Sequence, residues 1–498
     1  MKILLVNPPR YDKKLYSLRD EICFQDVPYV PFPIRLAQLG AILQQEKGWT
    51  VEALDANAAG WGWEELHARM PESDDVIFHS AAGLIKHDAK VAELAREKGG
   101  AKTILVENVV APIFPERILN DFPAIDFVVC GWPEAIVPDL LRHLDRPEGV
   151  SGVAYRGRPP GGSPSREGGI EDLDDLPMMA YDLFDPRDYS FGYLDAPMHE
   201  RIVPGIRIRT SRDCPFGCPF CLVGAGRGRG YTGKWRAMSP ERVVRELEHV
   251  VREYDVRGFF FWDETFTLNK KRSGEICDRI VKAKLDLEWR CLTRIDCVDK
   301  DVLRKMARAG CKLIEFGIES GDAVVRARLQ KRFSDDDAVE RVRLTRSLGI
   351  RANCDMIVGM PWESRSTLYR TLRLAKRLCA DNVHLTMAFP LPQTEFYDIV
   401  EAEDLLEADD IYELMIHERV RVGAKPHVRT RHLSAKELEK AWQSVRKQIN
   451  RHYFIRNVLL RPWDMRNVLA GARGPGELLA LIPKAGRFAM RHLIGAQV

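Results

Sequence analysis

Three cysteines fall within eight residues in the stretch Thr210-Ser211-Arg212-Asp213-Cys214-Pro215-Phe216-Gly217-Cys218-Pro219-Phe220-Cys221. Thiolates at this spacing can wrap an iron–sulfur cubane, because the glycine and the prolines let the loop curl around it. Protein-bound clusters usually take four protein ligands, so three cysteines leave one iron free for a substrate or cofactor. A structural zinc ion would need a fourth Cys or His nearby, and the nearest histidines in the sequence are His199 and His249. We therefore expect a 4Fe–4S cluster on Cys214, Cys218 and Cys221.

The other cysteines and the composition point to an ordinary protein of the cytoplasm. Hydrophobic residues make up 45% of the 498 residues, charged residues 30%, and the net charge is +3, which gives no indication of a nucleic-acid partner. No apolar run is long enough to span a membrane, and the opening MKILLVNPPR is too short for a signal-peptide core. Eight scattered cysteines read as small buried hydrophobic residues rather than disulfides: Cys23, Cys130, Cys277, Cys291, Cys297, Cys311, Cys354 and Cys379.

Residues 1–148 alternate short apolar runs with helical patterns, which predicts an α/β domain with a doubly wound parallel sheet. Ligands in such a domain bind beyond the carboxyl ends of the strands, which makes Ser80, Gly131 and Glu134 positional candidates for cofactor contacts. The expected strands are Ile3–Val6, Val51–Leu54, Val76–His79, Ile104–Val106 and Phe127–Cys130.

The rest of the chain divides into a linker, a second alternation and a helical end. Residues 149–202 are rich in Pro, Gly and Ser and predict a loop-rich linker. Six strand–helix units in 203–404 predict a parallel barrel, complete or partial, with its chemistry at the carboxyl ends of the strands. The expected strands are Ile206–Arg209, Phe259–Trp262, Trp289–Leu292, Leu313–Gly317, Asn353–Val358 and Val383–Met387. The sequence Ser239-Pro240-Glu241 is a clear helix start. Residues 405–498 predict a helical, increasingly basic cap.

The motif CxxxCxxC just after the first strand of this barrel resembles the radical S-adenosylmethionine superfamily. The resemblance implies that the free iron chelates the amino and carboxylate groups of S-adenosylmethionine. It also implies that an electron from the cluster breaks a sulfur–carbon bond, and that the resulting 5′-deoxyadenosyl radical abstracts a hydrogen atom. A flavodoxin or ferredoxin is the electron donor that the resemblance implies.

Later strand ends match the superfamily's cofactor-binding motifs. The resemblance assigns Asp263 and Glu264 to the methionyl ammonium and Arg294 to a polar contact with S-adenosylmethionine. It assigns Glu319 and Ser320 to the ribose or carboxylate, and Gly359 to the backbone along the adenine. A solvated loop for the acidic pair and a surface position for Arg294 are the alternatives.

The first domain is similar to the cobalamin-binding branch of the superfamily. That branch includes methyltransferases, the anaerobic magnesium-protoporphyrin cyclase group and the hopanoid cyclitol ether synthase group. This sequence resembles the last of these groups most. Two departures stand against a corrin: no Asp-x-His-x-x-Gly element follows the first strand, and Glu107-Asn108-Val109-Val110 replaces the usual Gly-Gly-x-His, with valines that would obstruct close approach. Cobalamin binding and a relic domain without a corrin both stay open. His79 is expected to be a core histidine, and Trp61 and Trp63 to belong to the core or an interface.

The branch implies a hydrophobic small-molecule substrate, lipid-like or tetrapyrrole-like, and methyl transfer, cyclisation or bond formation. The basic tail from Arg451 is either a helical cap or a shallow membrane-surface helix that would associate the protein with a membrane. A tRNA methylthiolation enzyme would need a second cysteine set, and the first domain offers only Cys23 and Cys130. A non-catalytic iron–sulfur or corrin-binding sensor would need a fourth protein ligand.

Overall fold

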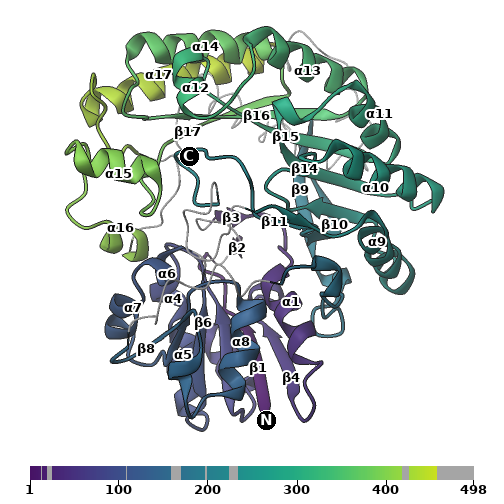
Figure 1. Ribbon diagram of the computed structural model, residues 1–498, viewed down its shortest axis with the longest axis vertical. Coiled ribbons are helices and arrows are strands. Elements are labelled where there is room, and N and C mark those ends of the chain that lie inside the picture. Colours follow the sequence, from purple (N-terminus) through teal and green to yellow (C-terminus); the bar gives the residue numbers. More distant parts are fainter. Residues whose placement is uncertain are drawn as a thin grey trace.

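Two largely parallel sheets, one in each lobe, organise the chain, as the computed structural model shows (Figure 1). The structure describes residues 1–12, 14–19, 25–107, 109–158, 170–196, 199–223, 234–417 and 425–456. Cys23, Asn108 and the basic tail from residue 457 onward lie outside the described residues. No helix of this described part is long and apolar enough to cross a membrane.

The first lobe is a doubly wound sheet with strand order β4-β1-β5-β6-β7-β8, as predicted. Successive residues of a strand face opposite sides of the sheet, and both sides are buried here. Leu5 and Ile77 pack with Leu39 of α1, whereas Leu4 and Phe78 join the cluster that holds α5 and α7. The strands are β1 (Lys2–Asn7), β4 (Thr50–Asp55), β5 (Asp75–His79), β6 (Lys102–Val106), β7 (Phe127–Val129) and the antiparallel edge β8 (Val153–Tyr155). The helices are α1 (Ile34–Leu43), α2 (Ala56–Ala59), α3 (Trp63–Arg69), α4 (Ile85–Asp88), α5 (Lys90–Glu97), α6 (Val110–Ile113), α7 (Pro115–Asp121) and α8 (Pro133–Arg142).

The second lobe is a curled half-barrel with helices on its outer face (Figure 1). Its order is β17-β16-β15-β14-β13-β10-β9, and all six predicted strands are present and parallel to one another. The strands are β9 (Ser190–Ala196), β10 (His199–Ile208), β13 (Gly258–Phe261), β14 (Glu288–Arg294), β15 (Cys311–Glu319), β16 (Arg351–Val358) and β17 (Asn382–Met387). The helices are α9 (Pro240–Tyr254), α10 (Lys270–Lys282), α11 (Lys300–Arg308), α12 (Ala323–Arg328), α13 (Asp335–Ser347), α14 (Arg365–Leu378), α15 (Glu395–Ala402), α16 (Ile411–His417) and α17 (Ala435–Phe454).

Side-chain caps decide where most helices of this lobe begin. α9 to α15 and α17 each follow a Ser, Thr, Asp or Asn whose side chain accepts a hydrogen bond from a backbone N–H of the first turn. The predicted start at Ser239 is confirmed, because its side chain accepts from the backbone N–H of Arg242.

The segment predicted as a loop-rich linker contributes strands to both sheets. β8 extends the first sheet, and β9 pairs antiparallel with β10. Short 3-10 helices lie around them at Pro147–Gly149, Leu173–Asp175 and Pro186–Asp188. A further hairpin, β2 (Tyr16–Leu18) and β3 (Gln25–Val27), lies between the lobes in Figure 1 and packs against Phe191 and Phe260 of the half-barrel.

Candidate functional site

The cysteine loop leaves the short strand β11 (Ser211–Arg212), which pairs with β12 (Arg236–Ala237). Asp213 turns the chain with a φ of 66° and accepts a hydrogen bond from Arg236 at 3.0 Å. The backbone N–H of Cys221 donates to the carbonyl of Cys218 at 3.1 Å, which closes a tight turn between these two cysteines. All three thiols of the loop are half-buried.

The chemistry of these thiols fits a metal cluster. Burial raises the pKa of the Cys214 and Cys218 thiols. A coordinating metal deprotonates such thiols outright. Among the described residues, no three His, Cys, Asp or Glu side chains converge as they would around a single metal ion. A cubane does not need that convergence, because each thiolate binds a different iron.

The two acidic residues after β13 have different surroundings. Asp263 is buried, and its carboxylate accepts hydrogen bonds from the backbone N–H and hydroxyl of Thr210, each at 3.1 Å, and from the hydroxyl of Ser211. Asp263 therefore ties the end of β13 to the start of the cysteine loop. Glu264 faces Arg209 at 3.5 Å and lies close enough to Cys214 to raise the pKa of that thiol. Of the pair, Glu264 is the carboxylate at the cysteines.

Arg294 lies against the cysteine loop, and its side chain is only 6% exposed, so it is not a surface arginine. Its guanidinium donates to both oxygens of Asp296, at 2.9 and 2.7 Å, and to the carbonyl of Gln330 at 2.9 Å. It also lies 3.6 Å from the sulfur of Cys218 and stacks on Phe216. These contacts hold a positive charge beside Cys218.

A second cation, Lys331, lies beside Cys218, and the sequence patterns did not single it out. Its Nζ is 2.9 Å from Oε1 of Glu319, and both side chains are buried. Burial lowers the pKa of Lys331, but the Glu319 carboxylate and the ionised form of Cys218 more than offset this and raise the pKa above its ordinary value. Lys331 lies in the loop after α12, where no periodicity marks a residue, so only its tertiary contact with Glu319 reveals it.

The β15 and β16 ends place the remaining predicted residues. Glu319 adopts a left-handed φ of 66°, and Ser320 behind it is buried, with its hydroxyl accepting from the backbone of Asp322 at 3.2 Å. Gly359 has a φ of 103°, and an added Cβ would lie 2.9 Å from the sulfur of Met387. Its N–H donates to Glu363 at 2.6 Å. A glycine is therefore required in this turn.

The strand ends of the first lobe are filled by the chain itself. Ser80 donates to Asp88 at 2.8 Å, and both oxygens of Asp88 accept from the buried Arg19, each at 2.8 Å. Arg19 also donates to the carbonyl of Pro9, after β1. Met415 of α16 accepts from the backbone of Gly83 at 2.7 Å. In this arrangement, a corrin could reach these strand ends only if the contacts of Arg19 and α16 opened.

Val109 and Val110 were expected to obstruct the approach of a corrin directly, but in the structure they pack beneath α16. Val109 and Val110 are buried in the same apolar cluster as Met415, so α16 covers the end of β6. Glu107 accepts hydrogen bonds from the backbone N–H groups of Val109 and Ala111, at 2.9 and 2.8 Å, and thus caps α6. His79 is buried, as expected of a core histidine.

Glu134 and Gly131 lie at the end of β7. Glu134 is 3.6 Å from Arg212, two residues before Cys214, and Arg212 also lies over the ring of Trp132. The half-buried Gly131 precedes Trp132. Glu134 therefore joins the first lobe to the cysteine loop.

Comparison with known proteins identifies the segment that carries the cysteine loop. The family described as the Radical SAM superfamily matches residues 208–375, which run from the end of β10 into α14 and include all three cysteines. The chain therefore contains a radical SAM domain. It is therefore an enzyme of the radical S-adenosylmethionine type, with S-adenosylmethionine and a 4Fe–4S cluster as cofactors.

Relatives whose similarity extends beyond this segment include methyltransferases and a cyclase. The chain is 27% identical over 448 residues to an uncharacterized methyltransferase of Pyrococcus horikoshii, covering 88% of this chain and 90% of the relative. It is 25% identical over 337 residues to the anaerobic magnesium-protoporphyrin IX monomethyl ester cyclase of Rubrivivax gelatinosus, covering 64% of this chain and 57% of the relative. The structure of the radical S-adenosylmethionine methyltransferase TsrM from Kitasatospora setae, with cobalamin and a [4Fe-4S] cluster bound, shares the fold with a TM-score of 0.63 at 17% identity, covering 89% of this chain and 85% of that one. The predicted similarity to the cobalamin-dependent methyltransferase and cyclase branch is confirmed at this level.

Proposed function

We propose that Cys214, Cys218 and Cys221 hold the 4Fe–4S cluster and that the surrounding charged residues bind the amino-acid end of S-adenosylmethionine. When bound, the cluster supplies the electron that breaks a sulfur–carbon bond of S-adenosylmethionine and yields the 5′-deoxyadenosyl radical. The observation that supports this proposal is the pair of cations, Arg294 and Lys331, held beside Cys218. In this proposal the fourth iron of the cluster binds S-adenosylmethionine and takes no ligand from the protein.

Each charged residue has a role that its contacts support. Glu264 is the carboxylate suited to the methionyl ammonium, since Asp263 already accepts three hydrogen bonds from Thr210 and Ser211. Asp263 then positions the loop rather than the cofactor. Arg294 and Lys331 are suited to the methionyl carboxylate, because charge-assisted hydrogen bonds are the strong ones. Ser320 keeps the turn at Glu319, and Gly359 with its neighbours provides backbone for the adenine.

The substrate is proposed to be an apolar or polycyclic small molecule, lipid-like or tetrapyrrole-like, that undergoes methyl transfer, cyclisation or bond formation. The cyclase of Rubrivivax gelatinosus and a hopanoid C-3 methylase of Methylococcus capsulatus support this range; the second is 26% identical over 279 residues, covering 54% of this chain and 49% of the relative. A flavodoxin or ferredoxin donor and peripheral membrane contact through the tail complete the proposal. Cobalamin, which is bound in the TsrM structure, is a proposed third cofactor, but no step here depends on it.

Cysteine substitution tests the cluster assignment. The protein is reconstituted anaerobically with iron and sulfide, then given dithionite and S-adenosylmethionine, and 5′-deoxyadenosine is measured. We expect the wild-type protein to release it and Cys218→Ala to release none, with a lower iron content. Cys379→Ser is the matched control, because Cys379 lies half-buried at the end of α14, outside the cysteine loop.

Two results would contradict the proposal. One is 5′-deoxyadenosine from Cys218→Ala at the wild-type rate. The other is an iron content that falls as far in Cys379→Ser as in Cys218→Ala.

A further inference from the structure

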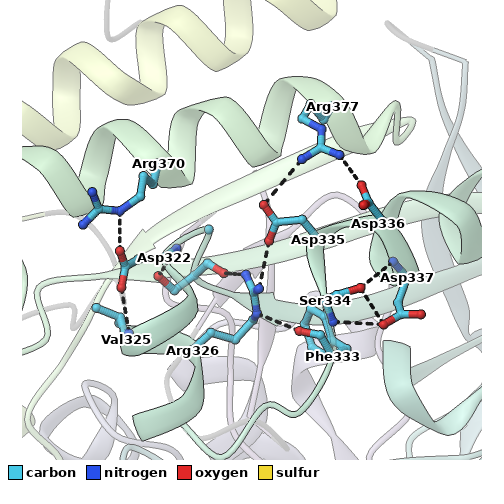
Figure 2. A network of polar contacts seen from close by, with 12 residues as sticks. Asp322, Val325, Arg326, Phe333, Ser334, Asp335, Asp336, Asp337, Arg370 and Arg377 are labelled. Atoms are coloured by element: carbon cyan, nitrogen blue, oxygen red, sulfur yellow. Dashed lines mark hydrogen bonds and ion pairs between the residues drawn. The ribbon is translucent and has the colours of Figure 1, made fainter.

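Arg326 lies on α12 at the centre of a network that joins the loops on both sides of this helix. Its side chain is 4% exposed, so its charge is removed from water. Figure 2 shows its guanidinium between Phe333, Asp335 and the chain that follows β15. A buried guanidinium is costly unless its donors are satisfied, and those of Arg326 are largely taken up by these partners.

The first of its contacts fixes the turn that carries Glu319. Nη1 of Arg326 donates to the carbonyl of Ser320 at 2.9 Å. Glu319, the preceding residue, has a left-handed φ of 66°, a conformation that costs a non-glycine residue about 1 to 3 kcal/mol and persists only when its surroundings hold it. The Arg326 hydrogen bond supplies part of that support.

The second set of contacts fixes the loop that carries Lys331. Nε of Arg326 donates to the carbonyl of Phe333 at 3.2 Å, and the backbone N–H of Lys331 donates to the carbonyl of Arg326 at 3.0 Å. The same residue therefore anchors both chains whose side chains, Glu319 and Lys331, meet in an ion pair beside Cys218.

Carboxylates hold Arg326 and α12 in turn. Asp335 accepts from Arg326 at 2.8 Å and also pairs with Arg377 of α14 at 3.6 Å. Asp322 caps α12 through the backbone N–H groups of Val324 and Val325 and is bound by Arg370. Figure 2 shows Arg370 and Arg377 approaching from α14, at the periphery of the network. Arg326 is the member that reaches the Glu319 turn.

We propose that Arg326 is a positioning residue, which sets the Glu319–Lys331 pair against Cys218 and thereby sets the affinity of the site for the amino-acid end of S-adenosylmethionine. This inference rests on the proposed role of Lys331, which Glu319 holds in place, in binding the methionyl carboxylate. Arg326 itself contacts neither the cysteines nor, in this assignment, the cofactor. The proposal concerns affinity, because a misplaced ion pair weakens binding before it alters the cluster.

The test compares Arg326→Lys with Arg377→Lys in reconstituted full-length protein. Lysine keeps the charge but loses the planar fork that serves several acceptors at once. We therefore expect the S-adenosylmethionine concentration for half-maximal 5′-deoxyadenosine formation to rise about tenfold in Arg326→Lys. Arg377→Lys, which changes a more exposed partner of the same Asp335, should leave it within about twofold, as expected for a surface ion pair.

Two further measurements separate positioning from general stability. Iron content should be unchanged in Arg326→Lys, and the EPR spectrum of its reduced cluster should respond to S-adenosylmethionine only at the higher concentration. Asp335→Asn, which weakens the hold on Arg326 without removing it, provides a milder variant and should shift the same concentration in the same direction.

The outcomes are distinct from those that test the cluster. Failure of the proposed function appears as a wild-type protein that releases no 5′-deoxyadenosine. An unchanged half-maximal concentration in both Arg326→Lys and Asp335→Asn overturns the positioning role. The positioning role is also overturned if the half-maximal concentration rises equally in Arg326→Lys and Arg377→Lys, in proportion to their loss of thermal stability.

Discussion

Lys331 is a buried ammonium whose cost is offset by a carboxylate and a thiol. An isolated charge in the interior would be strongly unfavourable, but Glu319 lies 2.9 Å away and Cys218 is close enough to raise the pKa of the lysine. A thiolate at Cys218, as in the cluster-bound state, strengthens that attraction. The charge of Lys331 is therefore matched to the loaded site more than to the empty one.

Removing this charge should affect stability and cofactor binding separately. Lys331→Met leaves Glu319 buried without its partner, and breaking a buried pair costs about 3 to 5 kcal/mol of unfolding free energy. The double variant Lys331→Met/Glu319→Gln should recover most of that loss in a thermal melt. It should not recover S-adenosylmethionine binding, because both proposed contacts are gone. A double variant that binds the cofactor normally would show that the pair is only structural.

The positions of the site residues were more predictable than their tasks. Arg294 and Glu319 end buried strands, and Cys214, Asp263 and Gly359 follow one within two residues. Strand ends are where a parallel barrel gathers its ligands. The hydrogen bonds that Asp263 accepts from Thr210 and Ser211 join two segments that are about fifty residues apart in sequence. No local sequence pattern could therefore predict them. Whether these residues contact S-adenosylmethionine stays a prediction.

At the scale of elements, the turn after β16 contains a buried acid whose titration is coupled to folding. Glu363 accepts the backbone N–H groups of Gly359 and Met360, at 2.6 and 3.0 Å, and burial raises its pKa from 4.5 to about 7. Between these two values the folded protein keeps a proton that the unfolded chain has lost. Stability from this group is therefore greatest below pH 4.5 and falls as the pH rises toward about 7.

Glu363→Gln should remove this dependence. The shift corresponds to about 3 kcal/mol, so the wild-type melting temperature should fall more steeply from pH 5 to pH 8 than that of the variant. The glutamine carbonyl can still accept from Gly359, which keeps the turn. Parallel pH profiles for the two proteins would show that another group controls the slope.

The predictable elements were those with continuous apolar runs. A central strand that is buried on both faces has an unbroken run of apolar residues in the sequence, which makes it easy to predict. Every expected strand of both sheets is present. β2, β3, β8 and β9 were not predicted, because short or edge antiparallel strands show little periodicity. The partner of β9 is the following strand β10, and the partners of the β2–β3 hairpin are aromatic side chains of the other lobe. Those contacts exist only in the folded molecule.

At the scale of the whole molecule, the two lobes are joined on both sides of the cysteine loop. The Glu134–Arg212 contact links the end of β7 to the residues before Cys214. Farther along, α16 lies on the first lobe, with Asp410 just before it pairing with Arg117 of α7 at 2.8 Å. The first lobe therefore covers the side of the half-barrel where the cysteine loop lies, as Figure 1 shows.

The same closure predicts how a corrin would have to bind. α16 and Arg19 cover the strand ends, so a bound corrin must displace them, and its apparent affinity is reduced by the cost of opening. After incubation with hydroxocobalamin and desalting, we expect retained corrin together with faster amide exchange in α16, and unchanged exchange in α10 on the outer face.

Tyr412→Phe removes the hydrogen bond from Tyr412 to Asp121 at 2.6 Å. Because this loss lowers the free energy that holds α16 closed by roughly 1 kcal/mol, the variant should bind the corrin about fivefold more tightly. Corrin retained with α16 still protected would place it elsewhere, and complete loss of corrin from both proteins would remove cobalamin from the cofactors. In that last case the Arg19–Asp88 pair is a permanent part of the core, and the first lobe serves to cover the cysteine loop.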